Sequence, residues 1–201
     1  MSAPWVMILA GGASRRMGGT DKALLPLAGR PLITHVRDRV EPQAGAVAAN
    51  TNTPGGLLGI GLPCHPDTLP DRPGPLAGIL TAMRWASEHG DQSFVITVPA
   101  DAPFLPGDLI PRLMLAADAP ARHAAVAASG GRLHPVCGLW PTALADDLDR
   151  AIRSGTRRVT DWTTAIDART ATFPATDPDP FYNVNTPEDL TRAAAYLDGT
   201  T

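Results

Sequence analysis

Basic residues and glycines gather in a short stretch near the start of the chain, between residues 9 and 22. The stretch follows an apolar run and holds four glycines, two arginines and Lys22. Glycines let backbone N–H groups approach a ligand closely, and consecutive amides can form a concavity that binds an anion. Arginine and lysine add full positive charge. The stretch is therefore predicted to hold a polyphosphate.

Neither of the two common phosphate-binding patterns fits this stretch. A Walker loop ends in Gly-Lys-Ser/Thr, whereas Lys22 stands between Asp21 and Ala23. The dinucleotide fingerprint G-x-G-x-x-G fails because Gly11 and Gly12 are adjacent, which excludes an oxidoreductase that uses a dinucleotide. What remains is another class of phosphate loop, or a glycine-rich loop whose basic residues are only solvated.

A single carboxylate, Asp101, follows the most strand-like segment of the chain. Pro99 and Pro103 flank it and restrict the backbone around it. Magnesium in phosphoryl and nucleotidyl transfer usually takes one or two carboxylates together with substrate phosphates. Asp101 is therefore the predicted Mg²⁺ ligand, and the alternative is an aspartate that serves a turn or a helix N-cap.

The elements that must position these groups alternate between strands and helices. Apolar runs predict strands at residues 5–10 and 93–98 and a weaker one at 44–49, while helical spacing predicts helices at 31–41, 75–89 and 109–117. This alternation indicates an α/β fold, a three-layer, doubly wound and mostly parallel sheet. Such sheets bind ligands beyond the carboxyl ends of their strands, where the glycine-rich stretch and Asp101 both fall.

The second half of the chain is less regular. We expect strands at residues 124–128 and 136–140 around a Ser-Gly-Gly turn, and helices at 143–153 and 159–166. Residues 174–180 are rich in proline and aspartate and predict a loop. Thr186 and Pro187 open a final helix well, as N-cap and first helical residue.

Composition bounds the class of protein. The chain has 201 residues, which suits one domain spanning residues 1–201. A net charge of −3 argues against a general nucleic-acid binder. The two cysteines lack zinc-site spacing, and no apolar run reaches the length of a signal core or a membrane span. We expect a soluble, cytoplasmic protein with no nucleic-acid or membrane partner.

The stretch L-A-G-G-x-S-x-R-M-G followed by lysine resembles the signature of the nucleotidyltransferases with a Rossmann-like fold, which include sugar-nucleotide pyrophosphorylases. Within that superfamily the chain more closely resembles the molybdenum cofactor guanylyltransferases. The matching blocks run through nearly the whole chain, at residues 9–22, 50–52, 67, 73–78, 99–103, 134–135, 157–159 and 183–188.

The resemblance implies a set of GTP-binding residues, which are Leu9, Ala10, Gly11, Gly12, Arg15, Lys22, Asn50, Asp67 and Asp101. It implies that Asn50 and Asp67 help to bind the guanine nucleoside, and that Asp101 binds both the nucleotide and Mg²⁺. The predicted catalytic residues are Lys22, Asp101 and Arg16. Lys22 would bind non-bridging phosphate oxygens, and Arg15 or Arg16 would meet the β- and γ-phosphates.

The implied reaction moves GMP from GTP onto the terminal phosphate of molybdopterin, with or without molybdenum, and releases pyrophosphate. The acceptor phosphate is already ionised, so no general base is required. In this reading the N-terminal half binds the nucleotide and the C-terminal half binds the acceptor. Candidate acceptor contacts are Arg157, Arg158, Asn183 and Asn185. The arginines could instead be a solvated helix start, and the asparagines could help to bind the metal or be turn or cap residues. His134 is expected to be structural or an acceptor contact.

Three alternatives stay open. A related enzyme transfers CMP to the same acceptor, but Gly11 replaces an alanine of its first motif and leaves room for a purine. Another sugar-phosphate or alcohol-phosphate nucleotidyltransferase is the second. The third is a GTP-binding accessory protein without transfer chemistry, which would not need the metal site at Asp101. Transient contact with other cofactor-biosynthesis proteins or molybdoenzymes is expected for the guanylyltransferase.

Overall fold

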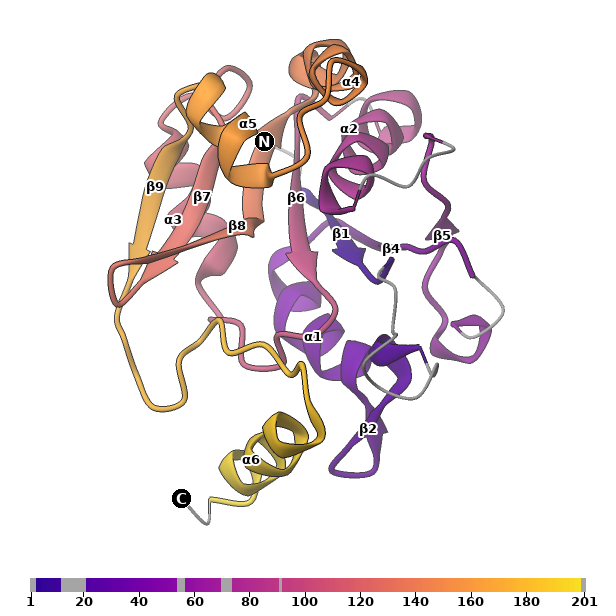
Figure 1. The fold of residues 1–201 in the computed structure, drawn as a ribbon, viewed down its shortest axis with the longest axis vertical. Helices are drawn as coiled ribbons and strands as arrows, with labels where there is room; N and C mark the ends of the chain where they lie inside the picture. The colour runs from indigo at the N-terminus through magenta and orange to yellow at the C-terminus, as the bar shows by residue number, and fades with distance from the viewer. Residues whose placement is uncertain (1–2, 12–20, 54–56, 70–73, 91, 200–201) are drawn as a thin grey trace.

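The molecule is built on a twisted sheet whose strands run in the order β5-β4-β1-β6-β8-β7-β9 (Figure 1). The computed structural model describes residues 3–11, 21–53, 57–69, 74–90 and 92–199. The strands are β1 Trp5–Leu9, β4 Ala46–Asn50, β5 Cys64–His65, β6 Phe94–Pro99, β7 Ala125–Ser129, β8 Arg132–Pro141 and β9 Arg169–Phe173.

The centre of this sheet is parallel. β1 pairs in parallel with β4 on one side and β6 on the other, and β4–β5 and β7–β9 are also parallel. Among the described strands of this sheet, only β8 runs antiparallel to its neighbours β6 and β7. Val6, Met7 and Ile8 of β1 are fully buried, because both faces of the central strand are covered. The predicted mostly parallel α/β sheet is confirmed.

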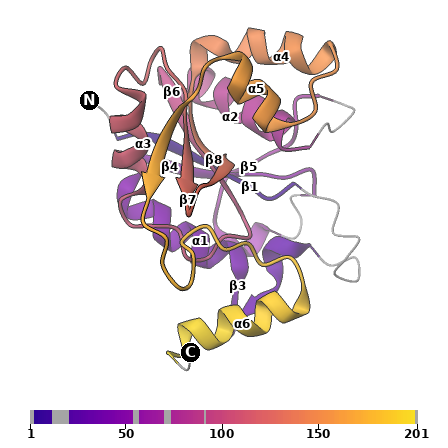
Figure 2. The same ribbon diagram turned by 60° about the vertical axis from the view of Figure 1, so that its left-hand side comes forward.

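Helices cover both faces of the sheet and make three layers (Figure 2). α1 and α3 pack on one face, in a core with Ile8, Ile96 and Val98, and α2, α4 and α5 pack on the other, in a core with Met7 and Trp140. The bounds are α1 Leu32–Val40, α2 Pro75–Gly90, α3 Leu109–Ala117, α4 Ala145–Arg153, α5 Val159–Ala165 and α6 Pro187–Leu197. Short 3₁₀ turns are η1 Lys22–Leu24, η2 Glu41–Gln43, η4 Leu58–Ile60 and η5 Thr142–Leu144.

α6 stands apart from these layers and packs on a small hairpin formed by β2 Pro26–Leu27 and β3 Arg30–Pro31 (Figure 2). A satellite cluster joins them, with Leu27, Leu32, Val184 and Ala193 buried in it. Thr186 and Asp189 form a capping box at the start of α6, as the sequence predicts. The last helix is therefore held to the rest of the protein by this cluster, which also includes Val184 from the segment before the helix.

The predicted elements are present, with boundary differences of one or two residues in most cases. Helix 109–117 matches α3, while the strand predicted at 136–140 is longer and begins at Arg132. The helix predicted at 143–153 divides into η5 and α4. β5, β9 and the β2–β3 hairpin are not in the sequence prediction. Within the described residues, no helix is long and apolar enough to cross a membrane.

Candidate functional site

Three neighbouring strands end at one edge of the sheet and bring their last residues together. Leu9 pairs with Asn50 on one side and with Pro99 on the other. Beyond the strands, the Ala10 amide donates to the Asn50 carbonyl at 2.9 Å, and the Ala100 amide donates to the Leu9 carbonyl at 3.1 Å. The start of the glycine-rich stretch thus lies between the residues that follow β4 and those that follow β6.

Lys22 reaches this edge from η1. The Asp21 side chain accepts from the Ala23 amide at 3.1 Å and caps the turn. The Lys22 ammonium donates to the Asp101 carboxylate and, at 2.7 Å, to Oδ1 of Asn185. The Lys22 and Asp101 side chains are 23% and 22% exposed, so both remain open to a ligand. The sequence prediction named all three residues but not their contact.

The chain before α6 is fastened to Asp101 as well. The Val184 amide donates to the backbone carbonyl of Asp101 at 2.9 Å. A local hydrogen bond orients the Asn185 side chain, since its Nδ2 donates to the Asn183 carbonyl at 3.4 Å. Asn183 is exposed. Of the two predicted acceptor-side asparagines, the structure therefore brings Asn185 into contact with Lys22 and leaves the Asn183 side chain at the surface.

The oxygen atoms around Lys22 suit a hard cation. Asp101 supplies a carboxylate and Asn185 an amide oxygen, and an ammonium group already lies against both. Among the described residues, no group of three or more histidine, cysteine, aspartate or glutamate side chains could hold a metal on its own. A magnesium ion here would thus need oxygens from a bound phosphate, which matches its usual coordination.

A second cluster, formed by Asn50, Asn52 and Asp67, follows β4 and β5. Asn50 uses both donors of its amide, to the His65 carbonyl at 3.1 Å and to Asp67 Oδ1 at 2.9 Å. Asn52 donates to Asp67 Oδ2 at 2.7 Å and accepts from the Asp67 amide at 2.9 Å. Asn50 Oδ1 and the remaining lone pairs of Asp67 are therefore acceptors, so this cluster can recognise hydrogen-bond donors.

Two glycines lie beside the Asn50 amide oxygen. A Cβ on Gly78, in the first turns of α2, would stand 2.6 Å from Asn50 Oδ1 and 3.0 Å from Leu9 Cδ2, and one on Gly11 would stand 3.5 Å from Asn50 Oδ1. The helix can approach β4 this closely only because residue 78 has no side chain. Sequence reasoning gave no role to Gly78 or Asn52, although both fall in the blocks that carried the resemblance.

Arg157 and Arg158 lie between α4 and α5. Arg157 Nη1 donates to the Ile152 and Thr156 carbonyls at 2.8 and 3.0 Å, so it satisfies backbone groups near the end of α4. Arg158 is exposed and precedes α5. In the part of the chain that the structure describes, no hydrogen bond or ion pair joins either arginine to Lys22, Asp101 or Asn185. Gly12, Arg15 and Arg16 lie outside the described residues.

His134 belongs to a group that sequence reasoning did not assemble. Its Nε2 lies 2.8 Å from Ser129 Oγ, which in turn donates to Asp179 Oδ2 at 2.7 Å. Its ring stacks on Phe181, with centroids 4.5 Å apart. Burial lowers the pKa of His134, against the opposing effect of Asp179. Ser129 and Asp179 were predicted only as turn and loop residues.

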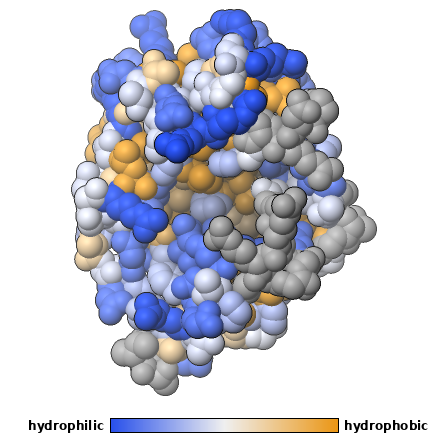
Figure 3. Space-filling view, viewed as in Figure 1, coloured by the Kyte–Doolittle hydropathy of each residue, from blue (hydrophilic) through white to orange (hydrophobic). Residues whose placement is uncertain are grey.

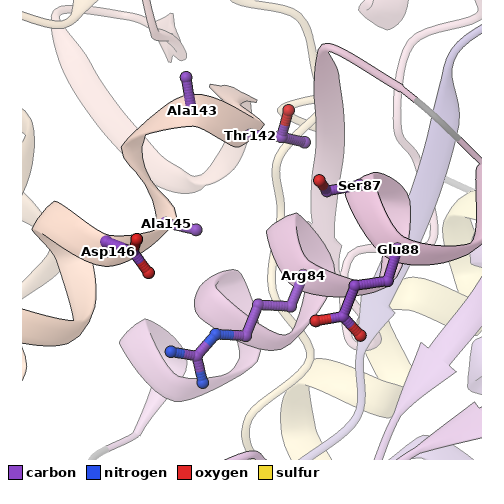
Figure 4. A pocket seen from close by; sticks show the side chains of 7 residues that line it. All are labelled: Arg84, Ser87, Glu88, Thr142, Ala143, Ala145 and Asp146. Carbon is purple, nitrogen blue, oxygen red and sulfur yellow. The ribbon is translucent and has the colours of Figure 1, made fainter.

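The face drawn in Figure 3 is hollowed near its centre, with hydrophobic residues in the hollow and hydrophilic ones around it. In the same view the end of β6 lies behind this region (Figure 1). A separate polar pocket of about 270 Å³ lies between α2 and α4 (Figure 4). Its charged residues are Arg84, Glu88 and Asp146, and Arg84 is paired with Asp149. None of the predicted site residues lines this pocket.

Comparison with known proteins shows which family has a similar sequence. Residues 6–169 match the MobA-like NTP transferase domain. The chain is 48% identical over 95% of both sequences to the molybdenum cofactor guanylyltransferase of Cereibacter sphaeroides. It is 45% identical to the protein of that name from Bradyrhizobium sp. (strain ORS 278), over 93% of this chain and 90% of the relative.

Solved structures match the fold. One is the molybdopterin-guanine dinucleotide biosynthesis protein A of Archaeoglobus fulgidus, with a TM-score of 0.74 and 22% identity over 97% of this chain and 99% of that one. Another is CMP:2-keto-3-deoxy-manno-octonic acid synthetase in complex with CTP, with a TM-score of 0.70 and 14% identity over 98% of each chain. At these identities the likeness concerns the fold alone.

Proposed function

The chain belongs to the MobA-like NTP transferase family, and from this premise we propose how its residues transfer GMP from GTP to the terminal phosphate of molybdopterin. The protein is a nucleotidyltransferase, a molybdenum cofactor guanylyltransferase that forms the guanine dinucleotide and releases pyrophosphate. The observation that carries the assignment of residues is the meeting of Lys22, Asp101 and Asn185 at the carboxyl edge of the sheet. The cluster of Asn50 and Asp67, whose free oxygen atoms can accept hydrogen bonds from the nucleotide, follows strands that end at the same edge.

Lys22 is the group we assign to the triphosphate. Its ammonium is held by one carboxylate and one amide oxygen, and a phosphate oxygen of higher negative charge can replace either partner. Arg15 and Arg16 are proposed to meet the β- and γ-phosphates, and the backbone of Leu9, Ala10, Gly11 and Gly12 to approach the nucleotide. The transfer is an in-line displacement at the α-phosphate, in which positioning and charge neutralisation supply the catalysis.

Asp101 and the Asn185 amide oxygen would hold Mg²⁺ together with phosphate oxygens of the nucleotide. When bound, the ion supplies positive charge to the phosphates. Asp101 is anchored for this task, because its carbonyl accepts from the Val184 amide and the prolines at 99 and 103 restrict its backbone.

Guanine specificity is assigned to the acceptor atoms of Asn50 and Asp67. Both donors of the Asn50 amide are already used, and both carboxylate oxygens of Asp67 already accept one bond. The atoms left for a ligand are acceptors, and guanine offers adjacent donors at N1 and its exocyclic amine. A site whose buried or partly buried acceptors would be left unpaired discriminates against a base that lacks those donors. This supports GTP over CTP.

The acceptor side is assigned to the C-terminal half of a single domain spanning residues 1–201, and the nucleotide side to the N-terminal half. Asn185 carries this assignment, since it reaches Lys22 from the segment before α6. Arg157, Arg158 and Asn183 have weaker support, because the described structure does not join their side chains to the Lys22 centre. A cytoplasmic location and contact with molybdoenzymes stay predictions.

The test is calorimetric titration of GTP, CTP and ATP, with and without Mg²⁺, into the wild-type protein and Asp101→Asn. We expect GTP to bind selectively, and its affinity to fall about tenfold or more without Mg²⁺ or without the Asp101 carboxylate. Asp108→Asn is the matched control, because Asp108 is an exposed aspartate paired with Arg112 a few residues downstream. Its affinity for GTP should match the wild type.

Pyrophosphate release with molybdopterin present completes the test. Release that needs GTP, Mg²⁺ and acceptor together supports the assignment. A preference for CTP would move the protein to the cytidylyl relatives, and GTP binding without release would make it a binding accessory. If Asp101→Asn bound and reacted as the wild type does, the metal site would have to lie elsewhere.

A further inference from the structure

Ser129, His134 and Asp179, which we name the latch, join two segments on the acceptor side of the sheet. Ser129 ends β7, His134 is the third residue of β8, and Asp179 belongs to the segment that leads to α6. Ser129 is only 2% exposed. The Ser129 hydroxyl bridges the other two side chains, at 2.8 Å from His134 Nε2 and 2.7 Å from Asp179 Oδ2.

The direction of the hydrogen bonds in the latch follows from the number of protons. A serine hydroxyl has one proton, and the Asp179 carboxylate can only accept it. His134 Nε2 must therefore donate to Ser129, which fixes the tautomer of a neutral imidazole. This N–H keeps the hydroxyl from rotating away from Asp179. Within the described residues, no hydrogen bond is formed by His134 Nδ1.

The latch holds one end of a strap, residues 179–185, whose other end carries Asn185. Asp179 Oδ1 accepts from the Phe181 amide at 2.8 Å, and the Asp179 carbonyl accepts from the Tyr182 amide at 2.9 Å. Phe181, 3% exposed, stacks between the His134 ring and the edge of Phe173. The strap then meets Asp101 through the Val184 amide.

We propose that the latch is a positioning device for the acceptor side, which acts through the strap on Asn185 and so on Lys22. His134 is thereby a positioning residue, not a catalytic one, since it touches Ser129 and Phe181 rather than Lys22 or Asp101. The inference rests on the proposed function for its kinetic part. The mechanical part, that the hydrogen-bonded hydroxyl orders the strap, can be tested without any substrate.

The variants separate hydrogen bonding from packing. His134→Phe keeps a ring against Phe181 but removes the donor to Ser129. His134→Gln removes the ring but keeps an N–H that can reach the hydroxyl. Ser129→Ala removes the hydroxyl and with it both hydrogen bonds of the latch. Thr176→Val is the matched control, because it removes a hydroxyl bond from the same loop, to the Pro178 carbonyl, that is no part of the latch.

The first measurement is amide hydrogen exchange of the strap in the unliganded protein. We expect exchange at Phe181 and Val184 to speed up about tenfold in His134→Phe and Ser129→Ala, and to stay at the wild-type rate in His134→Gln and Thr176→Val. Unchanged exchange in Ser129→Ala would overturn the latch, whatever the enzyme's activity. Equal acceleration in His134→Phe and His134→Gln would overturn the role of the hydrogen bond.

The second measurement is steady-state kinetics with molybdopterin, beside GTP affinity by calorimetry. We expect kcat/KM for the acceptor to fall about five- to tenfold in His134→Phe, the scale of one hydrogen bond, with any loss of GTP affinity appearing only when Mg²⁺ is present. His134→Gln should restore the rate. Because the effect passes through Asn185, His134→Phe should cost less in an Asn185→Ala background.

These outcomes keep the two hypotheses apart. A wild-type protein that orders its strap through the latch but transfers no GMP would refute the proposed function and leave the mechanical part of the inference intact. Full additivity of His134→Phe and Asn185→Ala in an active enzyme, or a loss of GTP affinity that is equally large without Mg²⁺, would refute the path through Asn185.

Discussion

Asn50 is 2% exposed, and within the described residues both donors of its amide are used while no hydrogen bond reaches its amide oxygen. α2 approaches this oxygen closely. Gly78 lies where a side chain would push against Asn50 Oδ1 and Leu9, and both of those residues are on the nucleotide side of the proposed site. The size of residue 78 therefore controls how closely α2 approaches the Asn50 amide that we propose for base recognition.

Gly78→Ala tests this control. An alanine in a helix usually stabilises by about 0.5–1 kcal/mol relative to glycine, but a Cβ placed 2.6 Å from Asn50 Oδ1 requires the helix or the amide to move. We expect a net loss of about 1–3 kcal/mol in unfolding free energy and weaker GTP binding. Urea unfolding and calorimetry measure both. Gly107→Ala, where a Cβ meets nothing within 4 Å, should change neither, and a Gly78→Ala protein with normal GTP affinity would refute this reading.

Lys22 is the only lysine in the sequence, which allows a chemical test of its role. An amine-specific reagent can modify only this side chain and the N-terminal amine. We expect GTP with Mg²⁺ to protect Lys22 from modification, as read by peptide mass spectrometry, because its ammonium would be engaged by phosphate oxygens. The N-terminal amine serves as the internal control. Equal labelling with and without GTP would count against the phosphate contact.

Lys22→Ala gives the corresponding functional test. Removing a charge that stabilises the transferring phosphate should lower kcat by about 10²- to 10³-fold. The cost in stability should be smaller, about 1–3 kcal/mol, because the Lys22 and Asp101 side chains are 23% and 22% exposed and Asp101 loses one charged hydrogen bond while keeping some access to water. Turnover assays and urea midpoints measure the two effects. An unchanged turnover would remove Lys22 from the catalytic residues.

At the scale of elements, the apolar runs and helical spacings of the first half are strong signals. Both faces of β1 and β6 are covered, so their sequences are apolar except for Thr97, whose hydroxyl is hydrogen-bonded, and α3 has the bounds that its spacing predicts. β5 is two residues long and is too short to show any period. β9 buries only Ala171 and Phe173 in its five residues. Its position at the sheet edge comes from pairing with β7, a long-range contact that no local pattern carries.

The same limit applies to the site. The convergence of the strand ends could be predicted, because parallel strands end at a common edge. The contact of Lys22 with Asn185 spans 163 residues of sequence, and the contacts of Asp67 with Asn50 and Asn52 depend on the short strand β5. Residue types named these groups as candidates, whereas only the fold decides which of them meet.

The start of α6 is an element with a direct link to the site. Asp189 Oδ2 accepts from the Asn185 and Thr186 amides, both at 2.9 Å, and Oδ1 accepts from the Tyr182 hydroxyl at 3.0 Å. Burial raises the pKa of Tyr182 to about 12, and the hydrogen bond to Asp189 adds to the shift. Asp189 therefore fixes the backbone of the residue that contacts Lys22.

Asp189→Ala should cost about 1–2 kcal/mol of stability, the range of a lost helix cap, and should also lower kcat/KM for the acceptor because Asn185 is no longer held. Urea unfolding and the transfer assay measure the two effects. Glu188→Ala is the control, since Glu188 is an exposed acid in the same first turn. Equal effects in the two variants would mean that only the charge near the helix start matters.

At the scale of the whole molecule, two partly buried histidines couple stability to pH. Burial lowers the pKa of His65, with a further contribution from nearby His89, and burial also lowers the pKa of His134. In both cases the unfolded chain, with a pKa of about 6.5, binds protons more readily than the folded protein. Stability therefore rises with pH across this window. It is fully present above about pH 6.5 and is lost as pH falls from there through the lower, folded pKa values.

The aspartates with lowered pKa values make stability depend on pH in a lower pH range than the histidines do. At Asp149, burial alone would raise the pKa, but the hydrogen bonds from Arg153 and Arg84 outweigh it and lower the pKa below the ordinary value. Its contribution is present above about pH 4 and is lost as pH falls through the folded pKa. Loss of stability between pH 6.5 and 4.5 should thus come from the histidines and not from this ion pair.

Thermal unfolding across pH tests the assignment. We expect the Tm of the wild type to be level above about pH 7 and to fall steadily from about pH 6.5 to pH 4.5, at constant ionic strength. His65→Gln combined with His134→Gln should flatten this slope, because neither glutamine binds a proton, while His134→Gln keeps the donor to Ser129. The decline below about pH 4, which belongs to Asp149 and to the other aspartates with lowered pKa values, Asp38 and Asp189, should survive in the double variant and serves as its internal control. A double variant whose Tm still falls with the wild-type slope between pH 6.5 and 4.5 would assign the coupling to groups other than His65 and His134.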